Sequence, residues 1–373
     1  MSGSPDADVL IVGAGPAGAA AAVVLRDRGL SVLLVDRATF PRDKLCGGGL
    51  TLRAIGVMGR VFGLAPDPAR TLTTGHVRLM AGARVLGDLP DAPPLSMVMR
   101  RDFDAALWAE AVRRGAEPLT ARVEAVDATA PAITVAGGRV ITARVLIGAD
   151  GAASRVARAL HGRPPEMGFA LEIEAPMRAG AAVELDLAAA VAGYGWAFPK
   201  TGSLTLGVGG LSSRNPNLKA AMAAYAAGHG AVADGCKGAF LPAGRVQGGR
   251  GAVLLAGDAA GTTDPVTGEG LAWAMQSGAL AGQAAAAAIV MGRPDHAATL
   301  HARAMRPICA ELFRARLLAR ALHHPLLNAR FLNLIGGSPR LQRRYLSLLA
   351  GEIDYADIGL RSLWRIARGL RAA

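Results

Sequence analysis

The stretch DVLIVGAGPAG, residues 8–18, decides the fold of this chain. A short apolar run precedes three glycines spaced as G-x-G-x-x-G, and the Ala-rich segment 19–28 that follows favours a helix. This order of strand, glycine turn and helix is typical of a dinucleotide-binding unit. Gly13 permits the tight turn, Gly15 lets the backbone approach a pyrophosphate, and Gly18 lets the helix pack closely on the strand.

A second apolar run, SVLLV at residues 31–35, ends in an acidic residue. Asp36 is placed to accept hydrogen bonds from an adenosine ribose, and this acid makes the unit more specific than its glycines alone. We also expect Ala17 and Arg37, beside the glycine turn and the acid, to contact the cofactor. This segment alone allows either NAD or FAD.

Two later segments favour FAD over NAD. RVLIGADGAAS at 144–154 resembles the D-G motif of flavin hydroxylases, in which a buried strand delivers Asp150 to a glycine turn. AVLLAGDAAG at 252–261 resembles their G-D motif, in which Asp258 would bond the ribitol. Either Asp-Gly pair alone could be an ordinary turn. Their order after the first unit predicts a flavin site.

The segment DPVTGEGL, residues 264–271, follows the G-D motif and opens a helix. By the same resemblance, the backbone at Gly268, Gly270 and Leu271 would reach the flavin ring at the helix N-terminus.

Between these motifs lie MRRDFD at 99–104, which opens a helix, and ARV at 121–123 on a following strand. The resemblance implies that Arg100 contacts the cofactor near its pyrophosphate or ring, as a guanidinium can do with an anion. It also implies that the backbone of Val123 hydrogen-bonds adenine. Arg100 could instead be a solvated residue at a helix start.

Two further stretches narrow the resemblance. PRDKLCGGGL at 41–50 and GYGWAFPK at 193–200 resemble motifs of the geranylgeranyl reductase family, the second matching its Y-x-W-x-F-P-K pattern. The resemblance covers residues 8 to about 280 closely, and the tail, including GEIDY at 351–355, more loosely.

The glycines at 47–49 suit a loop that lies against a flat ring, because they have no side chains to clash with it. We therefore place Gly47 and Gly48 at the flavin, with N–H groups available to its negative charge. The family motif implies that the adjacent Cys46 contacts the cofactor and has a catalytic or substrate-orienting role. Cys46 could instead be an ordinary small buried thiol.

Tyr194, Trp196 and Phe198 alternate along a predicted strand, so their side chains should project to one face. Such a stripe is often simply core. The family motif favours a wall of the substrate pocket, with Tyr194 and Trp196 as catalytic candidates and Trp196 and Phe198 at the substrate.

The region 162–250 alternates apolar and polar residues and predicts an antiparallel sheet that roofs the flavin ring. Its apolar inner face could hold an isoprenoid, and a helix at 217–227 should cover it. The expected fold is α/β: a three-layer Rossmann-type FAD-binding domain, an inserted antiparallel-sheet substrate domain and a helical C-terminal segment. The expected boundaries are 1–75, 100–160 and 245–295 for the FAD-binding domain, 76–99 and 161–244 for the substrate domain, and 296–373 for the C-terminal segment.

The family resemblance implies an FAD-dependent reductase that saturates isolated double bonds of a prenyl substrate by hydride transfer from reduced flavin. NADPH or a ferredoxin would supply electrons. Lys44, Lys200 and the arginine-rich tail are candidates to bind an anionic headgroup at the pocket mouth. The alternatives are an FAD-dependent monooxygenase or halogenase-like enzyme, and a flavoprotein that modifies a partner protein.

The charge of the chain is uneven. The net charge is +12, and residues 301–373 hold thirteen arginines against four carboxylates. Aromatic residues make up 4% of the chain and no nucleic-acid-binding motif accompanies the charge, so nucleic acid is not the expected partner. Residues 361–370 predict an amphipathic helix, which could make peripheral membrane contact or pack on its own domain.

The composition predicts a cytoplasmic protein. Cys46, Cys236 and Cys309 lie far apart, without disulfide logic or metal-ligand spacing. The N-terminus lacks the basic start of a signal peptide. The longest apolar run, near 284–291, falls short of the roughly 20 residues that a membrane span requires.

Overall fold

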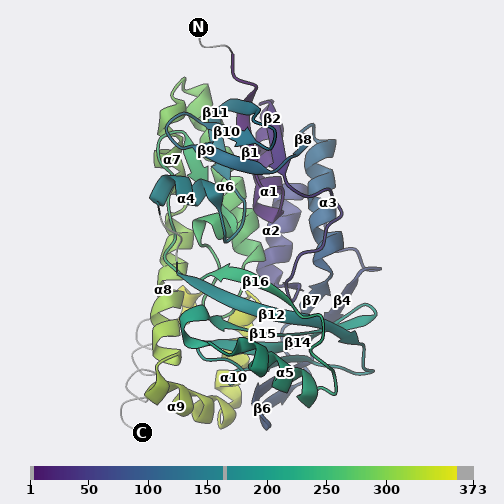
Figure 1. Ribbon diagram of the computed structural model, residues 1–373. Coiled ribbons are helices and arrows are strands. Elements are labelled where there is room, and N and C mark those ends of the chain that lie inside the picture. The colour runs from purple at the N-terminus through teal and green to yellow at the C-terminus, as the bar shows by residue number, and fades with distance from the viewer. Residues whose placement is uncertain (1–3, 163–165, 359–373) are drawn as a thin grey trace.

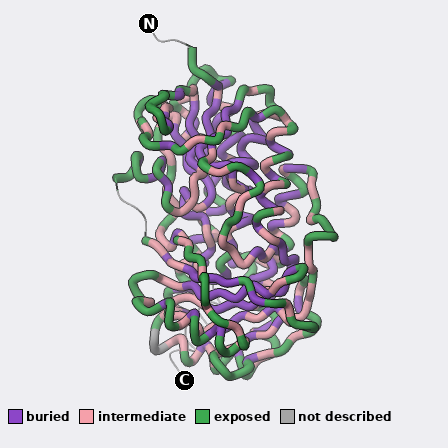
Figure 2. The backbone as a smooth tube through the Cα atoms, turned by 45° about the vertical axis from the view of Figure 1, so that its right-hand side comes forward, coloured by how far each residue is buried: buried purple, intermediate pink, exposed green. Residues whose placement is uncertain are grey.

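The computed structural model of the chain describes residues 4–162 and 166–358, apart from the side chains at 325 and 326. Figure 1 shows one sheet with its helices at the N-terminal end of the molecule and a second sheet at the opposite end, with α8 (Arg306–Leu322) along one side. Figure 2 shows that buried backbone is concentrated in both regions. The predicted α/β class with an inserted, largely antiparallel sheet is confirmed.

The first sheet has seven strands and contains the predicted dinucleotide-binding unit. Its five parallel strands bring together segments from the whole first two thirds of the chain. They are, in spatial order, β8 (Glu117–Thr120), β2 (Val32–Asp36), β1 (Ala7–Val12), β11 (Val140–Gly148) and β17 (Val253–Leu255), with β10 (Ala132–Val135) and β9 (Val123–Asp127) continuing antiparallel from β11. β1 and β2 each contain four successive apolar residues. These residues are buried because both faces of a parallel sheet are covered.

Helices α1 (Pro16–Arg26) and α6 (Leu271–Val290) pack together through small residues. A Cβ atom at Gly278 would lie 2.0 Å from the carbonyl oxygen of Ala17, so only glycine permits this approach. The close packing holds the N-termini of both helices near the carboxyl ends of the parallel strands, which is where α/β sheets bind ligands. The other helices of this half are α2 (Leu52–Phe62), α3 (Arg100–Arg113), α4 (Arg155–His161) and α7 (Ala297–Ala304).

The second sheet also has seven strands, and only β13 and β5 pair in parallel. Its order is β16 (Lys237–Pro242), β12 (Met167–Pro176), β15 (Ser203–Leu211), β14 (Gly193–Lys200), β13 (Val183–Asp186), β5 (Val77–Ala81) and β6 (Arg84–Leu89). Helix α5 (Leu218–Gly228) covers one face, as expected for 217–227.

The two faces of this sheet have different partners. The apolar residues Phe169, Leu171 and Ile173 of β12 pack in the cluster beneath α5, and therefore do not form the inner face that could hold an isoprenoid. Gly168 and Ala170 line the cavity instead. The alternation along β12 was interpreted correctly, but the covered face is the one under α5, because α5 supplies the apolar partners.

A three-stranded sheet and the C-terminal helices complete the fold. The small sheet pairs β3 (Gly49–Leu50), β7 (Leu95–Val98) and β4 (Thr71–Thr74), which fixes the glycine stretch 47–49 beside the second sheet. Beyond α8 lie α9 (Pro325–Gly336), α10 (Pro339–Leu349) and α11 (Tyr355–Ile358). Among the described residues, no helix is both long enough and apolar enough to cross a bilayer.

Candidate active site

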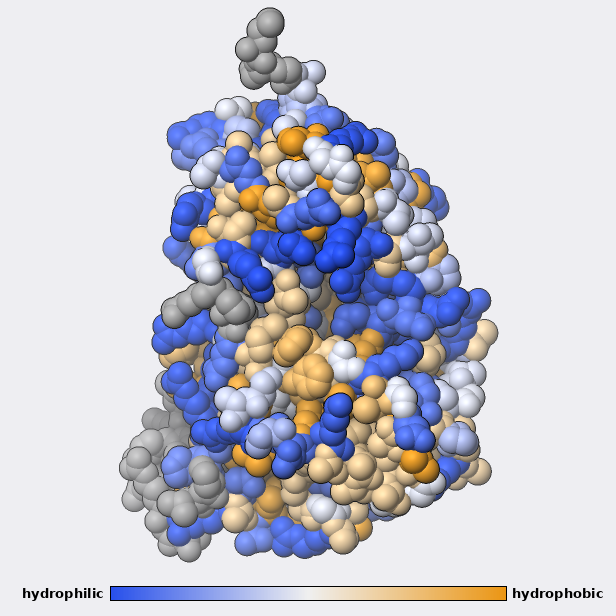
Figure 3. Space-filling view, viewed as in Figure 1, coloured by the Kyte–Doolittle hydropathy of each residue, from blue (hydrophilic) through white to orange (hydrophobic). Residues whose placement is uncertain are grey.

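A cavity of about 990 Å³ is lined by residues from both large sheets. Figure 3 shows the molecule hollowed between its two halves, with apolar residues gathered below the hollow. Nearly all the site residues predicted from sequence line this cavity. They are Gly13, Gly15, Ala17, Asp36, Arg37, Lys44, Cys46, Gly47, Gly48, Arg100, Val123, Asp150, Tyr194, Trp196, Phe198, Asp258, Gly268, Gly270 and Leu271.

The three cofactor motifs touch one another at their glycines. Gly13 has a φ of +99°, and a Cβ atom there would lie 2.3 Å from the carbonyl oxygen of Ala149, directly before Asp150. A Cβ atom at Gly257 would lie 2.9 Å from that of Ala17. Gly18 does not line the cavity; it packs against the carbonyl oxygen of Gly13, in the structural role predicted for it.

The acid at the end of β2 organises the turn beside it. The carboxylate of Asp36 accepts hydrogen bonds from the N–H groups of Ala14 (2.8 Å) and Ala38 (2.9 Å), and it still faces the cavity. Asp150 accepts from Ser154 Oγ at 2.5 Å and the Arg155 N–H at 2.7 Å. Burial raises the pKa of Asp150, while these hydrogen bonds lower it.

Arg42 is a cofactor candidate that the sequence analysis missed. Its Nη1 is buried and lacks a hydrogen-bond partner among the described residues. Its Nη2 makes an ion pair of 3.3 Å with Asp104 and lies 3.5 Å from the position of a Cβ at Gly15. An unpaired guanidinium donor beside a helix N-terminus is what a pyrophosphate requires. Its place in the family-like stretch 41–50, between Asp36 and the glycine loop at 47–49, was the signal available in the sequence.

Arg100 is buried in an ion pair rather than solvated. Its Nε and Nη2 donate to the two carboxylate oxygens of Asp104 at 2.7 and 2.8 Å. Burial lowers the pKa of Arg100, but Asp104 and then the Cys46 side chain raise it above the usual value. The structure therefore brings Arg100 and Cys46 together at the cavity wall.

The glycine loop rests on the aromatic stripe of β14. Tyr194, Trp196 and Phe198 lie in a row on one face, with ring centroids 5.8 and 6.5 Å apart, as the alternation predicted. A Cβ atom at Gly47 would lie 2.7 Å from the ring of Phe198 and 3.2 Å from Trp196 Nε1. That Nε1 is buried without a partner in the described part of the chain.

Tyr194 links β14 to residues 264–271, the segment that the sequence places at the flavin ring. These residues are called the flavin loop below. Its hydroxyl donates to the carbonyl oxygen of Thr267 at 3.0 Å, and a Cβ atom at Gly268 would lie 2.1 Å from it. Burial raises the pKa of Tyr194 above its usual value, so the hydroxyl stays protonated. One strand thus supports both the glycine loop and the flavin loop.

Lys200 is not at the pocket mouth. It shares the face of the aromatic stripe, but its side chain is 2% exposed and its Nζ lies 3.7 Å from Glu174 Oε1. A Cβ atom at Gly48 would lie 3.3 Å from Lys200 Cε, because the glycine loop covers this end of the strand. Lys200 is therefore covered by the glycine loop and does not line the cavity. Lys44, in contrast, is exposed and lines the cavity.

Glu172 lies beneath the same loop and was not predicted. Its Oε1 accepts from the Cys46 N–H at 3.2 Å, and its buried Oε2 has no partner among the described residues. Burial raises the pKa of Glu172 to about 7, with Lys200 lowering it and Glu174 raising it. This carboxyl group titrates near neutral pH directly behind the Cys46 backbone.

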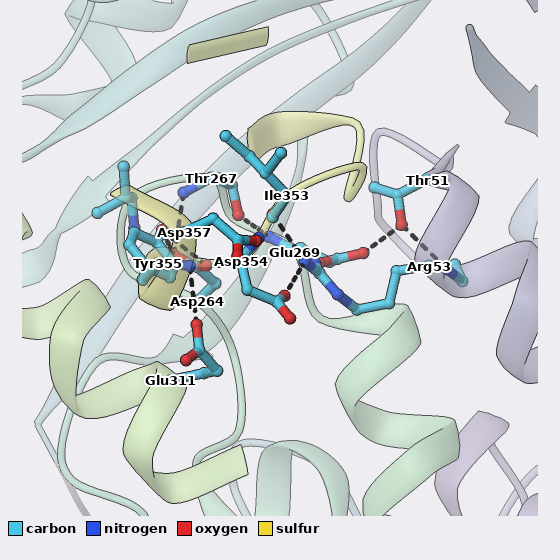
Figure 4. A network of polar contacts seen from close by, with 12 residues as sticks. Thr51, Arg53, Asp264, Thr267, Glu269, Glu311, Ile353, Asp354, Tyr355 and Asp357 are labelled. Carbon is cyan, nitrogen blue, oxygen red and sulfur yellow. Dashed lines mark hydrogen bonds and ion pairs between the residues drawn. The ribbon is translucent and has the colours of Figure 1, made fainter. Parts of the chain in front are cut away.

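A turn near the C-terminus holds the flavin loop from the other side, as Figure 4 shows. The Tyr355 hydroxyl donates to both oxygens of buried Asp264 at 2.8 and 2.9 Å. Glu269 accepts from Thr51 and Arg53, and Arg53 also pairs with Asp354 at 2.7 Å. Burial raises the pKa values of Asp264 and Glu269. The loosely matching stretch 351–355 therefore supports the flavin loop from outside the cavity.

The predicted amphipathic segment 361–370 lies outside the described residues.

Comparisons with known proteins agree with the FAD site that the geometry indicates. The family profile described as FAD binding domain matches residues 6–175. The chain is 34% identical to the menaquinone reductase of Mycobacterium tuberculosis, over 76% of this chain and 77% of that protein. It is 30% identical to the geranylgeranyl diphosphate reductase of Rhodobacter capsulatus, over 77% of each.

Among solved structures, a geranylgeranyl bacteriochlorophyll reductase-like protein from Thermoplasma acidophilum superposes with a TM-score of 0.75. It is 20% identical, over 96% of this chain and 99% of that one, and so supports the fold. The profile match, together with the unpaired donor of Arg42 and the touching glycine turns, confirms FAD as the cofactor.

Proposed function

Because this chain belongs to the geranylgeranyl reductase family of FAD-dependent oxidoreductases, we propose that it saturates an isolated double bond of a prenyl chain. The observation that carries this proposal is the aromatic stripe of β14, which lines the cavity while supporting the glycine loop and the flavin loop. Such an arrangement suits an apolar substrate held beside the flavin ring. The names of the two relatives, both enzymes with prenyl-bearing substrates, favour the same class.

In this proposal the backbone of Gly13, Gly15, Gly270 and Leu271 and the side chains of Asp36, Arg42 and Asp258 hold the cofactor. FAD, when bound and reduced, supplies the hydride that adds to one alkene carbon. A proton reaches the other carbon from water or a nearby acid, and NADPH or a ferredoxin restores the two electrons.

The chain's own residues position the alkene and exclude water. Trp196 and Phe198 form the wall along which the prenyl chain lies. Cys46 and Tyr194 orient the reacting double bond. Cys46 lies beside Arg100, and its N–H donates to Glu172. Tyr194 is held by the carbonyl oxygen of Thr267. Excluding bulk water protects the reduced cofactor from side reactions.

The test is anaerobic turnover of the reduced holoenzyme with menaquinone, geranylgeranyl diphosphate and a geranylgeranylated glycerophospholipid. Mass spectrometry should show a product that has gained two hydrogens per reduced bond. A Trp196→Ala variant should lower turnover, whereas a change at exposed Val232 should not. A product that gains one oxygen when air is admitted, with no saturated product, would favour a monooxygenase and overturn the proposal.

A further inference from the structure

Glu172 lies beneath the glycine loop but does not line the cavity. In the strand register, Glu172 of β12 stands opposite Gly207 of β15, and Gly207 stands opposite Trp196 of β14. A Cβ atom at Gly207 would collide with the Trp196 indole, so the ring lies over this glycine. Residues that stand opposite each other project to the same face of a sheet. The carboxyl group of Glu172 and the indole of Trp196 therefore lie side by side under the loop.

Each of these two side chains has a buried polar atom without a hydrogen-bond partner among the described residues. The atoms are Glu172 Oε2 and Trp196 Nε1. Glu172 Oε1 accepts from the Cys46 N–H at 3.2 Å, and Trp196 Nε1 lies 3.2 Å from the position of a Cβ at Gly47. A carboxylate in this place would lack the several hydrogen bonds that a buried charge requires.

The lysines around Glu172 are paired with other carboxylates. Lys200 Nζ lies 3.7 Å from Glu174 Oε1, on the next residue of β12 that shares this face. Lys237 of β16 stands opposite Glu172 in the register, but its Nζ lies 3.6 Å from Asp43 Oδ2. Neither lysine lies within ion-pair distance of Glu172. The fold therefore gives this carboxyl group no cation of its own among these neighbours.

Burial outweighs the charged groups that face Glu172. It raises the pKa of Glu172 to about 7, although Lys200 on β14 and the Cys46 N–H and Lys44 in the loop lower it. Glu174, on the same strand, raises it further. The carboxyl group is therefore mainly neutral in mildly acidic solution and mainly charged in mildly alkaline solution.

The charge of Glu172 matters because of what lies in front of the loop. Gly47 and Gly48 line the cavity, where the proposed function places them at the flavin ring. Loop N–H groups can stabilise the negative charge of reduced flavin. A carboxylate behind the same loop would repel that charge, whereas a neutral carboxyl group would not.

We propose that Glu172 is a positioning residue that acts through the glycine loop. As a neutral acid it holds Cys46 and the loop against reduced FAD, and as a carboxylate it opposes reduction of the flavin. This inference rests on the proposed function, because it takes the glycine loop to lie at the flavin.

Reduction of the cofactor is then coupled to a proton. When two electrons arrive from NADPH or a ferredoxin, the Glu172 carboxylate takes one proton from water and becomes neutral, in addition to the proton that the flavin itself takes up. Reoxidation returns that proton to water. The coupling is reciprocal: negative charge on the flavin raises the pKa of Glu172, and a neutral Glu172 favours the reduced flavin to the same extent.

The first experiment needs no substrate. The reduction potential of the bound FAD is measured by anaerobic titration with dithionite and a reference dye between pH 5 and pH 9. Near neutral pH the wild-type potential should fall more steeply with pH than that of Glu172→Gln, which keeps the acceptor for the Cys46 N–H but cannot ionise. Glu117→Gln, at an exposed carboxyl group on β8, should keep the wild-type profile. Parallel profiles for wild type and Glu172→Gln would overturn the proposal.

The second experiment measures kcat/KM per bound flavin against pH, with whichever prenyl compound of the turnover test is saturated. Once Glu172 ionises, the wild-type value should fall about tenfold per pH unit, as the neutral fraction does. Glu172→Gln should show no such fall. Glu172→Ala, which lacks the acceptor for the Cys46 N–H, should be slower than Glu172→Gln at every pH.

The comparison of the two variants separates positioning from proton donation. If Glu172→Gln were as slow as Glu172→Ala at pH 6, the proton itself would be required and the positioning role would be overturned. Failure of the proposed function would look different. In that case no prenyl compound would be saturated, while the potential of the bound FAD would still show the steeper slope that depends on Glu172.

Discussion

Where the glycine turns meet, at one end of the cavity, glycine backbones leave no space between chain segments, whereas around the aromatic stripe of β14 the loops are held by side chains. Three chain segments approach one another at Gly13 and Gly257. They lie so close that a Cβ atom at either glycine would clash with the neighbouring segment. At the other end, the Tyr194 hydroxyl, the Glu172 carboxyl group and the Tyr355 hydroxyl hold the loops.

The largest effect should follow Gly13→Ala. The substitution places a Cβ 2.3 Å from the Ala149 carbonyl oxygen at a residue with φ +99°, so the turn must separate from the Asp150 strand. We expect loss of bound flavin and a stability loss of at least about 2 kcal/mol. Visible absorbance of the purified protein and thermal unfolding measure both.

Gly29→Ala is the matched control for this prediction. Gly29 also has a positive φ, +75°, but a Cβ there meets nothing within 4 Å. It should cost about 1 kcal/mol and leave the flavin bound. If Gly13→Ala stays as yellow as Gly29→Ala, the backbone contact is not what holds the cofactor end together.

The difference between the two ends also explains what could be predicted from sequence. Glycine turns impose local requirements that a short motif displays, so Gly13, Asp150 and Asp258 were all placed at one cavity. Side-chain sites depend on what covers them. The alternation that correctly put Trp196 beside the cavity also carried Lys200 to that face, but the glycine loop covers Lys200.

Contacts between distant segments left still less trace in the sequence. Tyr355 and Asp264 are 91 positions apart, and Arg53 and Asp354 are 301 apart. Glu172 looked like the polar member of an alternating strand until the fold placed it behind Cys46. Hydrophobic periodicity reports which face a residue occupies, but not which loop later packs on that face.

Glu172→Gln should change the pH dependence of stability. The pKa of Glu172 is raised from 4.5 to about 7 by burial, so the folded protein binds more protons than the unfolded chain between these values. Stability contributed by this group is present at the low end of that window and is lost as pH rises through it, by up to about 3 kcal/mol. Gln keeps the acceptor for the Cys46 N–H.

Denaturant unfolding at pH 5 and pH 8 measures this prediction. The wild type should lose more stability between the two pH values than Glu172→Gln does. Glu117→Gln, at an exposed carboxyl group on β8 of the other large sheet, should retain the wild-type slope. Parallel pH profiles for wild type and Glu172→Gln would show that Glu172 is already ionised in the folded protein at pH 5.

A smaller effect is expected for Tyr355→Phe. It removes the hydroxyl that donates to buried Asp264, which keeps its hydrogen bonds from the Val266 and Thr267 N–H groups. The loss of one hydrogen bond to a buried charged group should cost about 2 kcal/mol and weaken FAD binding. Tyr345→Phe is the control, since no described residue hydrogen-bonds its hydroxyl. Equal flavin dissociation constants for the two variants would show that the turn containing Tyr355 does not support the flavin loop.

The smallest effect should come from Tyr194→Phe. This variant tests whether the contact between β14 and the flavin loop affects the environment of the flavin. The variant keeps the ring in the aromatic stripe but loses the hydrogen bond to the Thr267 carbonyl oxygen, worth about 1 kcal/mol. Tyr225→Phe loses a comparable bond, to Glu184 at 3.3 Å, beneath α5 on the opposite face of the sheet. Both should lower the unfolding midpoint slightly, but only Tyr194→Phe should alter the visible circular dichroism of the bound flavin. An identical flavin spectrum in both variants would mean that the substrate wall and the flavin loop are adjacent without being coupled.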